Sequence, residues 1–211
     1  MRKPFHAGMP ASLSTEPTTS CNLRCPECPS GLRQFTRPAG QMPEEDFKNI
    51  IDQLKDRLAY LLLYFQGEPF LNPDIFKMIR YASKNRIYTT SSTNGHYLED
   101  DNARNIVASG LDRLIISMDG TDQYTYERYR RGGELDRVTD GIQSLVRWKK
   151  QLRSSRPYII LQFLVLKTNE HQIPAMKKLA KELQVDRLEF KSAQIYDLEQ
   201  NHDLIPKNTK Y

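Results

Sequence analysis

The sequence predicts an α/β fold in which parallel strands alternate with helices. Short apolar segments of strand length recur along the chain, and longer segments with the period of an amphipathic helix lie between them. A chain of 211 residues is long enough for one domain with a substantial core. Six such strands in order, joined by right-handed crossovers, favour a curved, open six-stranded barrel. Periodicity alone leaves a flat, doubly wound sheet as the alternative.

The expected elements follow from the apolar runs and the residues that punctuate them. Strands are predicted over residues 12–18, 60–66, 87–93, 113–119, 158–167 and 187–193. Helices are predicted over residues 43–58, 73–85, 99–109, 135–152 and 173–183. Asn72 is placed to cap a helix that begins at Pro73, and Gly110 stands where a glycine commonly ends one.

Composition narrows the class of protein. The net charge is +5, but the basic residues alternate with acidic ones along the predicted helices, as on ordinary solvated faces, which disfavours a nucleic-acid partner. No apolar run approaches the roughly 20 residues of a membrane span, so no membrane partner is expected. The basic N-terminus lacks the apolar stretch of a secretory signal, so a cytoplasmic location is expected.

The three cysteines, Cys21, Cys25 and Cys28, all lie in one eight-residue segment. Three thiolates at this spacing can reach one metal centre, and thiolates select zinc, copper(I) or iron–sulfur clusters. A structural zinc or an ordinary four-iron cluster takes four protein ligands, so three cysteines leave one coordination position open. Neither His6 nor His96 has the spacing of a zinc-finger ligand. Clustered cysteines without pairing partners also fit a reducing compartment.

This CxxxCxxC segment, directly after a predicted strand, resembles the cluster-binding loop of the radical S-adenosylmethionine (radical SAM) superfamily. The resemblance implies that Cys21, Cys25 and Cys28 hold three irons of a [4Fe-4S] cluster, and that SAM chelates the fourth. It implies reductive cleavage of the sulfonium to a 5′-deoxyadenosyl radical, which abstracts hydrogen from substrate. It also implies a partial (β/α)6 open barrel with parallel strands, which decides between the two architectures.

The resemblance sets the expected domain organisation. Residues 1–195 are predicted to form the radical SAM core domain, with a cluster loop over 19–42, since long connections in compact domains are usually functional or disordered. Pro26 and Pro29 restrict the backbone of this loop, and Gly31 lets the chain turn away close beside it. Residues 196–211 read as a polar tail. Relatives of this type continue into a cysteine-rich SPASM region, so this tail is expected to begin a C-terminal extension that is missing here.

A second motif follows the second predicted strand. Gln66, Gly67, Glu68 and Pro69 resemble the GGEP motif of the family, in which backbone carbonyls and a carboxylate receive the ammonium group of SAM. Glycine permits close backbone approach, and a carboxylate suits an ammonium partner. Gln66 departs from the family's glycine, so the backbone path there is open. Without the cysteines, Gly-Glu-Pro would be an ordinary strand-to-helix turn.

The third and fourth predicted strands end in further candidates. Asn94 belongs to a Thr-Asn-Gly strand end similar to the one that lies under the cofactor in the family, although Asn-Gly is also an ordinary turn. In the family, a serine on the fourth strand and an arginine after it bind the carboxylate and ribose of SAM. Ser117 fits the first role, and Asp119 shares its strand face. Arg130 and Arg131 fit the second, since a guanidinium matches a carboxylate bidentately.

The remaining polar positions carry weaker predictions. Gln162 interrupts an apolar strand and either lines the pocket or faces the surface. Asn169, Glu189 and Lys191 are candidate adenine-side or substrate-side groups. Surface or packing roles are expected for Arg128, His171, His202, Tyr124, Tyr126 and Tyr129.

The chain is therefore predicted to be the core of a radical SAM enzyme. Relatives of this type suggest a peptide or protein substrate, with a small molecule as the alternative, and an electron donor such as flavodoxin or ferredoxin. A non-catalytic iron–sulfur or zinc-binding partner module is the rival interpretation, although such a module has no use for a pocket that binds an aminocarboxylate. A zinc-dependent nucleic-acid binder lacks both a fourth ligand and a concentrated basic patch.

Overall fold

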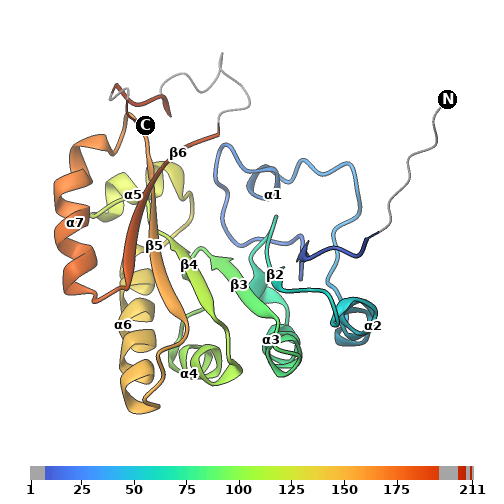
Figure 1. The fold of residues 1–211 in the computed structure, drawn as a ribbon. Coiled ribbons are helices and arrows are strands. Elements are labelled where there is room, and N and C mark those ends of the chain that lie inside the picture. The colour runs from blue at the N-terminus through green and yellow to red at the C-terminus, as the bar shows by residue number, and fades with distance from the viewer. Residues whose placement is uncertain (1–7, 195–203, 208–209, 211) are drawn as a thin grey trace.

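The fold is a six-stranded, all-parallel sheet with helices on its outer side (Figure 1). The computed structural model describes residues 8–194, 204–207 and 210. The strands are β1 (Ser12–Ser14), β2 (Tyr60–Leu62), β3 (Tyr88–Thr93), β4 (Arg113–Ser117), β5 (Tyr158–Val165) and β6 (Arg187–Ser192). Their order across the sheet is their order along the chain, and each pairs in parallel with the next. The predicted architecture is confirmed.

The helices connect successive strands. They are α1 (Pro29–Leu32), α2 (Glu44–Leu54), α3 (Ile75–Lys84), α4 (Asp100–Ser109), α5 (Gln123–Tyr129), α6 (Leu135–Gln151) and α7 (Ile173–Glu182), with 3₁₀ turns η1 (Pro69–Leu71) and η2 (Glu170–Gln172). The five longest were predicted. The helices α1 and α5 were not, because four and seven residues are too few for a periodic signal. None of the described helices is long and apolar enough to cross a membrane.

The helix ends were predicted in part. Gly110 ends α4 in the left-handed conformation, with φ of 84°, as expected. The prediction for Asn72 is wrong, because α3 begins at Ile75 with Asp74 as its N-cap residue. The Asn72 amide instead donates to the carbonyls of Pro17 (2.7 Å) and Met42 (2.9 Å), while its Oδ1 accepts from the Asp74 N–H. Asn72 therefore ties this turn to both ends of the cysteine-bearing loop.

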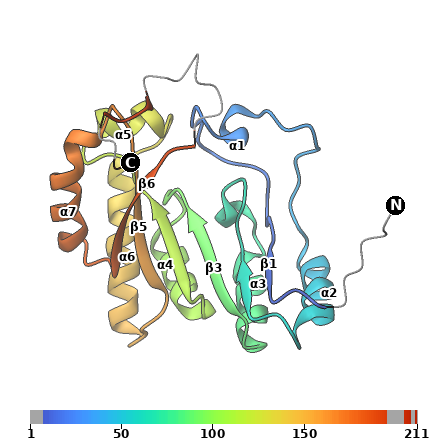
Figure 2. The same cartoon turned by 45° about the horizontal axis from the view of Figure 1, so that its top comes forward.

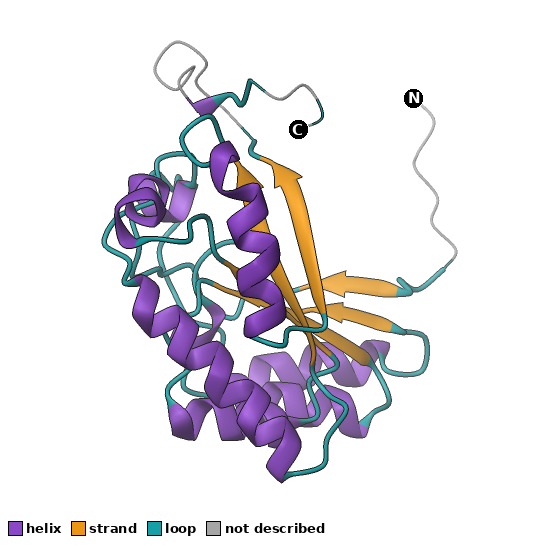
Figure 3. Ribbon diagram, turned by 90° about the vertical axis from the view of Figure 1, so that its left-hand side faces the viewer, coloured by secondary structure: helices purple, strands orange, loops and turns teal. Residues whose placement is uncertain are grey.

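The two faces of the sheet differ in character. The helices gather on one side (Figure 3), and the side chains pointing there are buried and mostly apolar: Leu61, Leu63, Leu114, Ile116, Leu161, Phe163 and Val165. The inner wall of a closed barrel is usually filled by branched apolar side chains. In this open barrel the opposite face is partly exposed and carries Tyr60, Tyr64, Tyr88, Arg113, Gln162 and Glu189. This face runs up to the carboxyl ends of the strands.

Several strands end earlier than predicted, and their last residues form loops at that edge. The side chains there take over hydrogen bonds that a ladder would make: Glu16 accepts from the Gln66 N–H (3.2 Å), and Asp119 accepts from the Leu164 N–H (2.7 Å). The carboxyl edge is thus held together by polar side chains of sequence-distant loops.

The predicted tail is described only in part. Residues 195–203, with His202, and residues 208–209 and 211 lie outside the described residues. The Lys167 N–H donates to the Leu204 carbonyl (3.1 Å), and the Leu204 side chain packs against a small apolar cluster that includes Leu23 and Cys25. This part of the tail therefore packs against the domain, which its polar composition did not predict.

Candidate cofactor site at the carboxyl edge of the sheet

The cysteine-bearing loop lies over the carboxyl ends of the strands, where parallel barrels place their active sites (Figure 2). Cys21, Cys25 and Cys28 are free thiols and line one cavity of about 110 Å³. The cavity is also lined by Leu23, Tyr64, Phe65, Gly67, Glu68, Ser92, Thr93, Asn94, Ser117 and Arg130. Eight of the predicted site residues therefore meet here, from the cysteine loop, the loops after β2 and β3, the last residue of β4 and the end of α5.

A glycine lets the loop fold onto itself beside the cysteines. The Cys28 N–H donates to the Cys25 carbonyl (3.3 Å), and α1 begins immediately after Cys28. A Cβ at Gly31 would lie 2.6 Å from the Cys25 nitrogen and 2.7 Å from its carbonyl oxygen. Only glycine allows the backbone of α1 to lie this close to the backbone of Cys25, as the sequence predicted. The helix α1 therefore packs directly against the second cysteine.

Gly67 fixes the neighbouring loop after β2. Its φ is 79°, and a Cβ there would lie 2.2 Å from the Thr18 carbonyl oxygen. The next residue, Glu68, donates its N–H to the Ser20 carbonyl (2.8 Å). The Gly-Glu-Pro turn is therefore packed against the residues that lead into Cys21.

Gln66, which stands where the family motif has glycine, has a contact of its own. Ser30 on α1 donates its hydroxyl to Gln66 Oε1 (3.0 Å) and accepts the Gly67 N–H (2.8 Å). The same Oε1 lies 3.6 Å from the Cys28 sulfur. Gln66 thus joins the motif to the cysteine segment, a role that a glycine cannot supply.

Two polar side chains approach the other sulfurs. Asn94 Nδ2 lies 3.8 Å from the Cys21 sulfur, and Arg130 Nη1 lies 3.9 Å from the Cys25 sulfur. Burial raises the pKa of Cys21 to about 11 and raises the pKa of Cys25 as well. Since metals bind thiolates, metal binding at these buried thiols must release protons.

The donor set fits an iron–sulfur cluster. Among the described residues, no three His, Cys, Asp or Glu side chains converge on a single metal ion. A four-iron cluster takes one thiolate at each iron, so its three cysteines surround it and do not meet at one point. Three thiols around one cavity, with N–H donors facing two of them, match this requirement.

Glu68 is buried, with 1% of its surface exposed. Its carboxylate accepts hydrogen bonds from the Phe70 N–H (3.2 Å), the Thr93 hydroxyl (2.9 Å) and the Asn94 N–H (2.8 Å). Desolvation by burial raises its pKa to about 7. Glu68 therefore both lines the cavity and joins the end of β2 to the end of β3.

Ser117 and Asp119 have different positions. Ser117 is the last residue of β4 and lines the cavity. Asp119 lies beyond the strand, is fully buried, and pairs with Arg130 Nε at 2.6 Å. Burial raises the pKa of Asp119, and the positive charge of Arg130 opposes that rise. Asp119 stands behind Arg130, whose guanidinium lines the cavity.

Four predicted positions do not line the cavity. Besides Asp119, Pro69 is buried at the start of η1. The Arg131 side chain is exposed, and its carbonyl accepts the Arg24 N–H (3.0 Å), which ties this loop to the cysteine segment. Gln162 on β5 pairs in register with Ser117 and is half-buried on the inner face of the sheet.

The residues with weaker predictions differ in burial and in their contacts. Asn169 is fully buried and donates to the carbonyls of Asp119 (3.0 Å) and Leu164 (2.8 Å), so it joins the ends of β4 and β5. Glu189 pairs with Arg187 (3.1 Å) on the inner face. Lys191, Arg128, His171 and Tyr124 are exposed, whereas Tyr126 and Tyr129 are buried.

Sequence reasoning missed five residues of the cavity wall: Leu23, Tyr64, Phe65, Ser92 and Thr93. Phe65 is the most unusual of them, because 72% of its surface is exposed at the cavity. All five directly flank the motifs that were predicted. The available signal was the position of Leu23 between two cysteines and of the other four at the carboxyl ends of β2 and β3.

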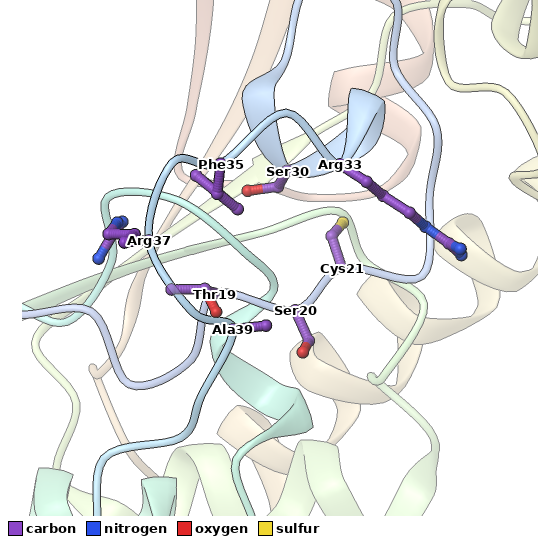
Figure 4. Close-up of a pocket in the computed structure, with 8 residues that line it drawn as sticks. All are labelled: Thr19, Ser20, Cys21, Ser30, Arg33, Phe35, Arg37 and Ala39. Atoms are coloured by element: carbon purple, nitrogen blue, oxygen red, sulfur yellow. The ribbon is translucent and has the colours of Figure 1, made fainter.

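A second hollow of about 340 Å³ is enclosed by residues of the cysteine loop (Figure 4). It is lined by Thr19, Ser20, Cys21, Ser30, Arg33, Phe35, Arg37 and Ala39. Arg37 pairs with Glu16 (2.5 Å) and lies over the Phe35 ring. Cys21 therefore lines both the cavity and this hollow.

A family comparison decides the class of this protein. The model of the radical SAM superfamily matches residues 15–188, which includes all three cysteines and every cavity-lining residue. The chain belongs to the radical SAM superfamily. The resemblance inferred from the motifs is confirmed.

Named relatives of this radical SAM domain are enzymes. It is 30% identical to an AdoMet-dependent heme synthase from Methanosarcina barkeri, over 82% of the chain and 48% of the relative. It is 27% identical to a PqqA peptide cyclase from Gluconobacter oxydans, over 89% of the chain and 50% of the relative. The chain thus spans about half the length of these relatives. These relatives support the prediction that the chain belongs to an enzyme, and not the rival interpretation of a non-catalytic binding module.

Solved structures share the fold of this radical SAM domain. Streptococcus suis SuiB bound to S-adenosylmethionine superposes with a TM-score of 0.72 at 20% identity, over 93% of this chain and 46% of SuiB. SuiB bound to its precursor peptide SuiA gives a TM-score of 0.73 at 19% identity, over 95% of this chain and 42% of SuiB. At this identity the likeness shows the architecture, a curved parallel barrel.

Proposed function

We propose that this chain is the catalytic core of a radical SAM enzyme that modifies a peptide or protein. The observation that carries the proposal is the meeting of three free thiols with Glu68, Ser117 and Arg130 around one cavity, in a chain of this superfamily. Cys21, Cys25 and Cys28 would hold a [4Fe-4S] cluster. When bound, the cluster and SAM supply a one-electron reductive cleavage that yields a hydrogen-abstracting radical.

The residues opposite the thiols suit an aminocarboxylate. Arg130 uses its Nε to bind Asp119, which orients the guanidinium and leaves further N–H groups toward the cavity for a carboxylate. Ser117 adds a hydroxyl on the same side. Gly67 and Glu68 offer backbone carbonyls and a carboxylate for an ammonium group. Asn94 completes this wall beside Cys21.

The relatives support the substrate class. One is named a peptide cyclase, and SuiB has been solved with a precursor peptide. The heme synthase favours a small-molecule substrate as the second candidate. Three unpaired thiols at one site also fit a reducing compartment, so we place the protein in the cytoplasm, with a flavodoxin- or ferredoxin-like donor as the source of electrons.

Anaerobic reconstitution tests the proposal. The protein should bind about four iron and four sulfide per chain. Alanine at Cys21, Cys25 or Cys28 should abolish this, whereas the control Ser20→Ala, which alters an exposed neighbour, should not. SAM should perturb the EPR signal of the reduced cluster, and dithionite should then release 5′-deoxyadenosine. Stoichiometric zinc that survives iron loading, or a spectrum unchanged by saturating SAM, would contradict the proposal.

A further inference from the structure

The inner face of the sheet carries an ordered group of side chains well below the cofactor cavity. Tyr60 on β2 and Tyr88 on β3 pair in register, and their rings stack with centroids 5.4 Å apart and planes 11° apart. The guanidinium of Arg113 on β4 lies over the Tyr88 ring, 5.7 Å from its centroid. The Tyr60 and Thr90 hydroxyls are hydrogen-bonded at 2.9 Å, which fixes the first ring. We name Tyr60, Tyr88 and Arg113 the tyrosine–arginine group.

Arg113 is held by a side-chain hydrogen bond with Tyr88 and by the negative charge of Glu189. Among the described residues, no carboxylate lies within ion-pair distance of Arg113. Glu189, on the same face, pairs with Arg187. A guanidinium has five N–H donors, so a hydrogen bond with Tyr88 leaves further donors, which can match a carboxylate bidentately.

Both faces of the Tyr88 ring are already in contact with other side chains. Since β3 lies between β2 and β4, Tyr60 approaches Tyr88 from one side and Arg113 approaches it from the other. A planar base or ring of a ligand therefore has no open face of Tyr88 on which to stack. The group is built to hold the guanidinium, and its chemistry is that of a carboxylate receptor.

The spacing to the cavity sets the size of the ligand. Arg113 and Ser117 lie on the same face of β4, four residues apart, which is about 13 Å along a strand. Ser117 lines the cofactor cavity. A ligand that reaches from the cavity to Arg113 along this wall must therefore span about four residues of extended peptide.

We propose that Arg113, held against Tyr88, binds an acidic side chain of the peptide substrate, about four residues from the residue presented to the cavity. The inference rests on the proposed function, because it names a feature of that function's substrate. Arg113 is on this account a specificity residue, remote from the reacting atoms. The partly open inner wall is the path along which the peptide lies.

Selection of peptides by charge tests the inference. A library of randomised decapeptides, each linked to the nucleic acid that encodes it, is passed over the immobilised, cluster-loaded protein. SAM is present and the reductant is omitted, so that only peptide binding is measured. The wild type should enrich Asp or Glu about ten-fold at one position, as expected for one charged hydrogen-bonded pair. Arg113→Glu should replace that preference with Lys or Arg, and Arg113→Lys should keep a weaker acidic preference.

A matched control and a second readout separate the possible results. Arg137→Gln removes an ion-paired cation of α6, on the outer side of the sheet, leaves the charges around Arg113 in place, and should leave the acidic preference unchanged. The inference is overturned by any of three results: the wild type retains no peptide, it does not enrich Asp or Glu, or Arg113→Glu enriches Asp or Glu as strongly as the wild type. The EPR response to SAM is recorded on the same samples. If SAM changes the EPR signal normally but no acidic preference appears, only the inference about Arg113 is rejected. If SAM does not change the EPR signal, the proposed function is rejected whichever peptides are retained.

Discussion

At the scale of single residues, Glu68 is a buried carboxyl group held by three donors from two strand ends. Burial raises its pKa from 4.5 to about 7. Between these values the unfolded chain binds fewer protons at this site than the folded one, so the free energy of unfolding falls as pH rises. The stability from this group is fully present below about pH 4.5 and is lost by about pH 7.

Glu68→Gln should remove this dependence. Urea unfolding of the cluster-free protein at several pH values between 4.5 and 7 measures it. The wild type should lose on the order of 3 kcal/mol relative to the variant across this window. Parallel curves for the two proteins would show that Glu68 does not titrate in it.

The pair of Asp119 and Arg130 is the second residue-scale feature. It is buried, with 0% and 12% of the two side chains exposed. Asp119→Ala should destabilise the fold by about 3–5 kcal/mol, because Arg130 is left as an unpaired buried charge. The exposed pair of Arg137 and Glu99 is the control, and Arg137→Ala should cost less than about 1 kcal/mol. Equal losses in thermal or urea unfolding would refute this difference.

At the scale of elements, the contact between α1 and the second cysteine depends on Gly31. Gly31→Ala places a Cβ within 2.7 Å of the Cys25 backbone, so the cysteine segment must shift. Gly40→Ala is the matched control in the same loop, because a Cβ there meets no atom within 4 Å. Gly31→Ala should lower iron content after reconstitution to well under half of the wild-type value, and Gly40→Ala should leave it unchanged. The same iron content in both variants would contradict the prediction.

The elements also show how far the sequence predicts the fold. The long helices and the strands follow from periodicity, whereas the choice of an open barrel over a doubly wound sheet followed from the family resemblance. Several helix and strand ends did not follow, because Asn72, Glu16 and Asp119 form hydrogen bonds with loops distant in sequence. A capping or strand pattern read from neighbouring residues contains no information on such partners. The helix α5 is too short to carry its own periodic signal.

At the scale of the whole molecule, the same reasoning explains the site. The cysteines were predicted from their spacing, and the motifs at the ends of β2, β3 and β4 from the family resemblance; they come together because the strand ends of a parallel barrel meet at one edge. Phe65 and Thr93 belong to that edge, but their side chains carry no signature of cofactor chemistry. The tyrosine–arginine group was missed for another reason. Its members lie on three strands, and only the register of the sheet brings them together.

The final prediction concerns how the whole domain responds to SAM. A ligand that binds only the folded protein, at 100 times its dissociation constant, adds about 2.7 kcal/mol to the free energy of unfolding. For a domain of this size that corresponds to a rise in Tm of roughly 5–10 °C. The rise should appear in cluster-loaded protein under anaerobic scanning calorimetry. It should be nearly absent in Cys25→Ala, because the loop would then lack a ligand of the proposed cluster, which on our proposal forms part of the SAM site.

Ser117→Ala refines this prediction. Loss of one hydrogen bond to a charged carboxylate should weaken SAM binding by about ten-fold, which removes about 1.4 kcal/mol. At the same SAM concentration the rise in Tm should therefore fall to about half of the wild-type value. Ser117 is the last residue of β4, and its substitution leaves the strand pairing intact, so the Tm without SAM should change little. An equal rise in wild type, Cys25→Ala and Ser117→Ala would mean that SAM binds outside this cavity.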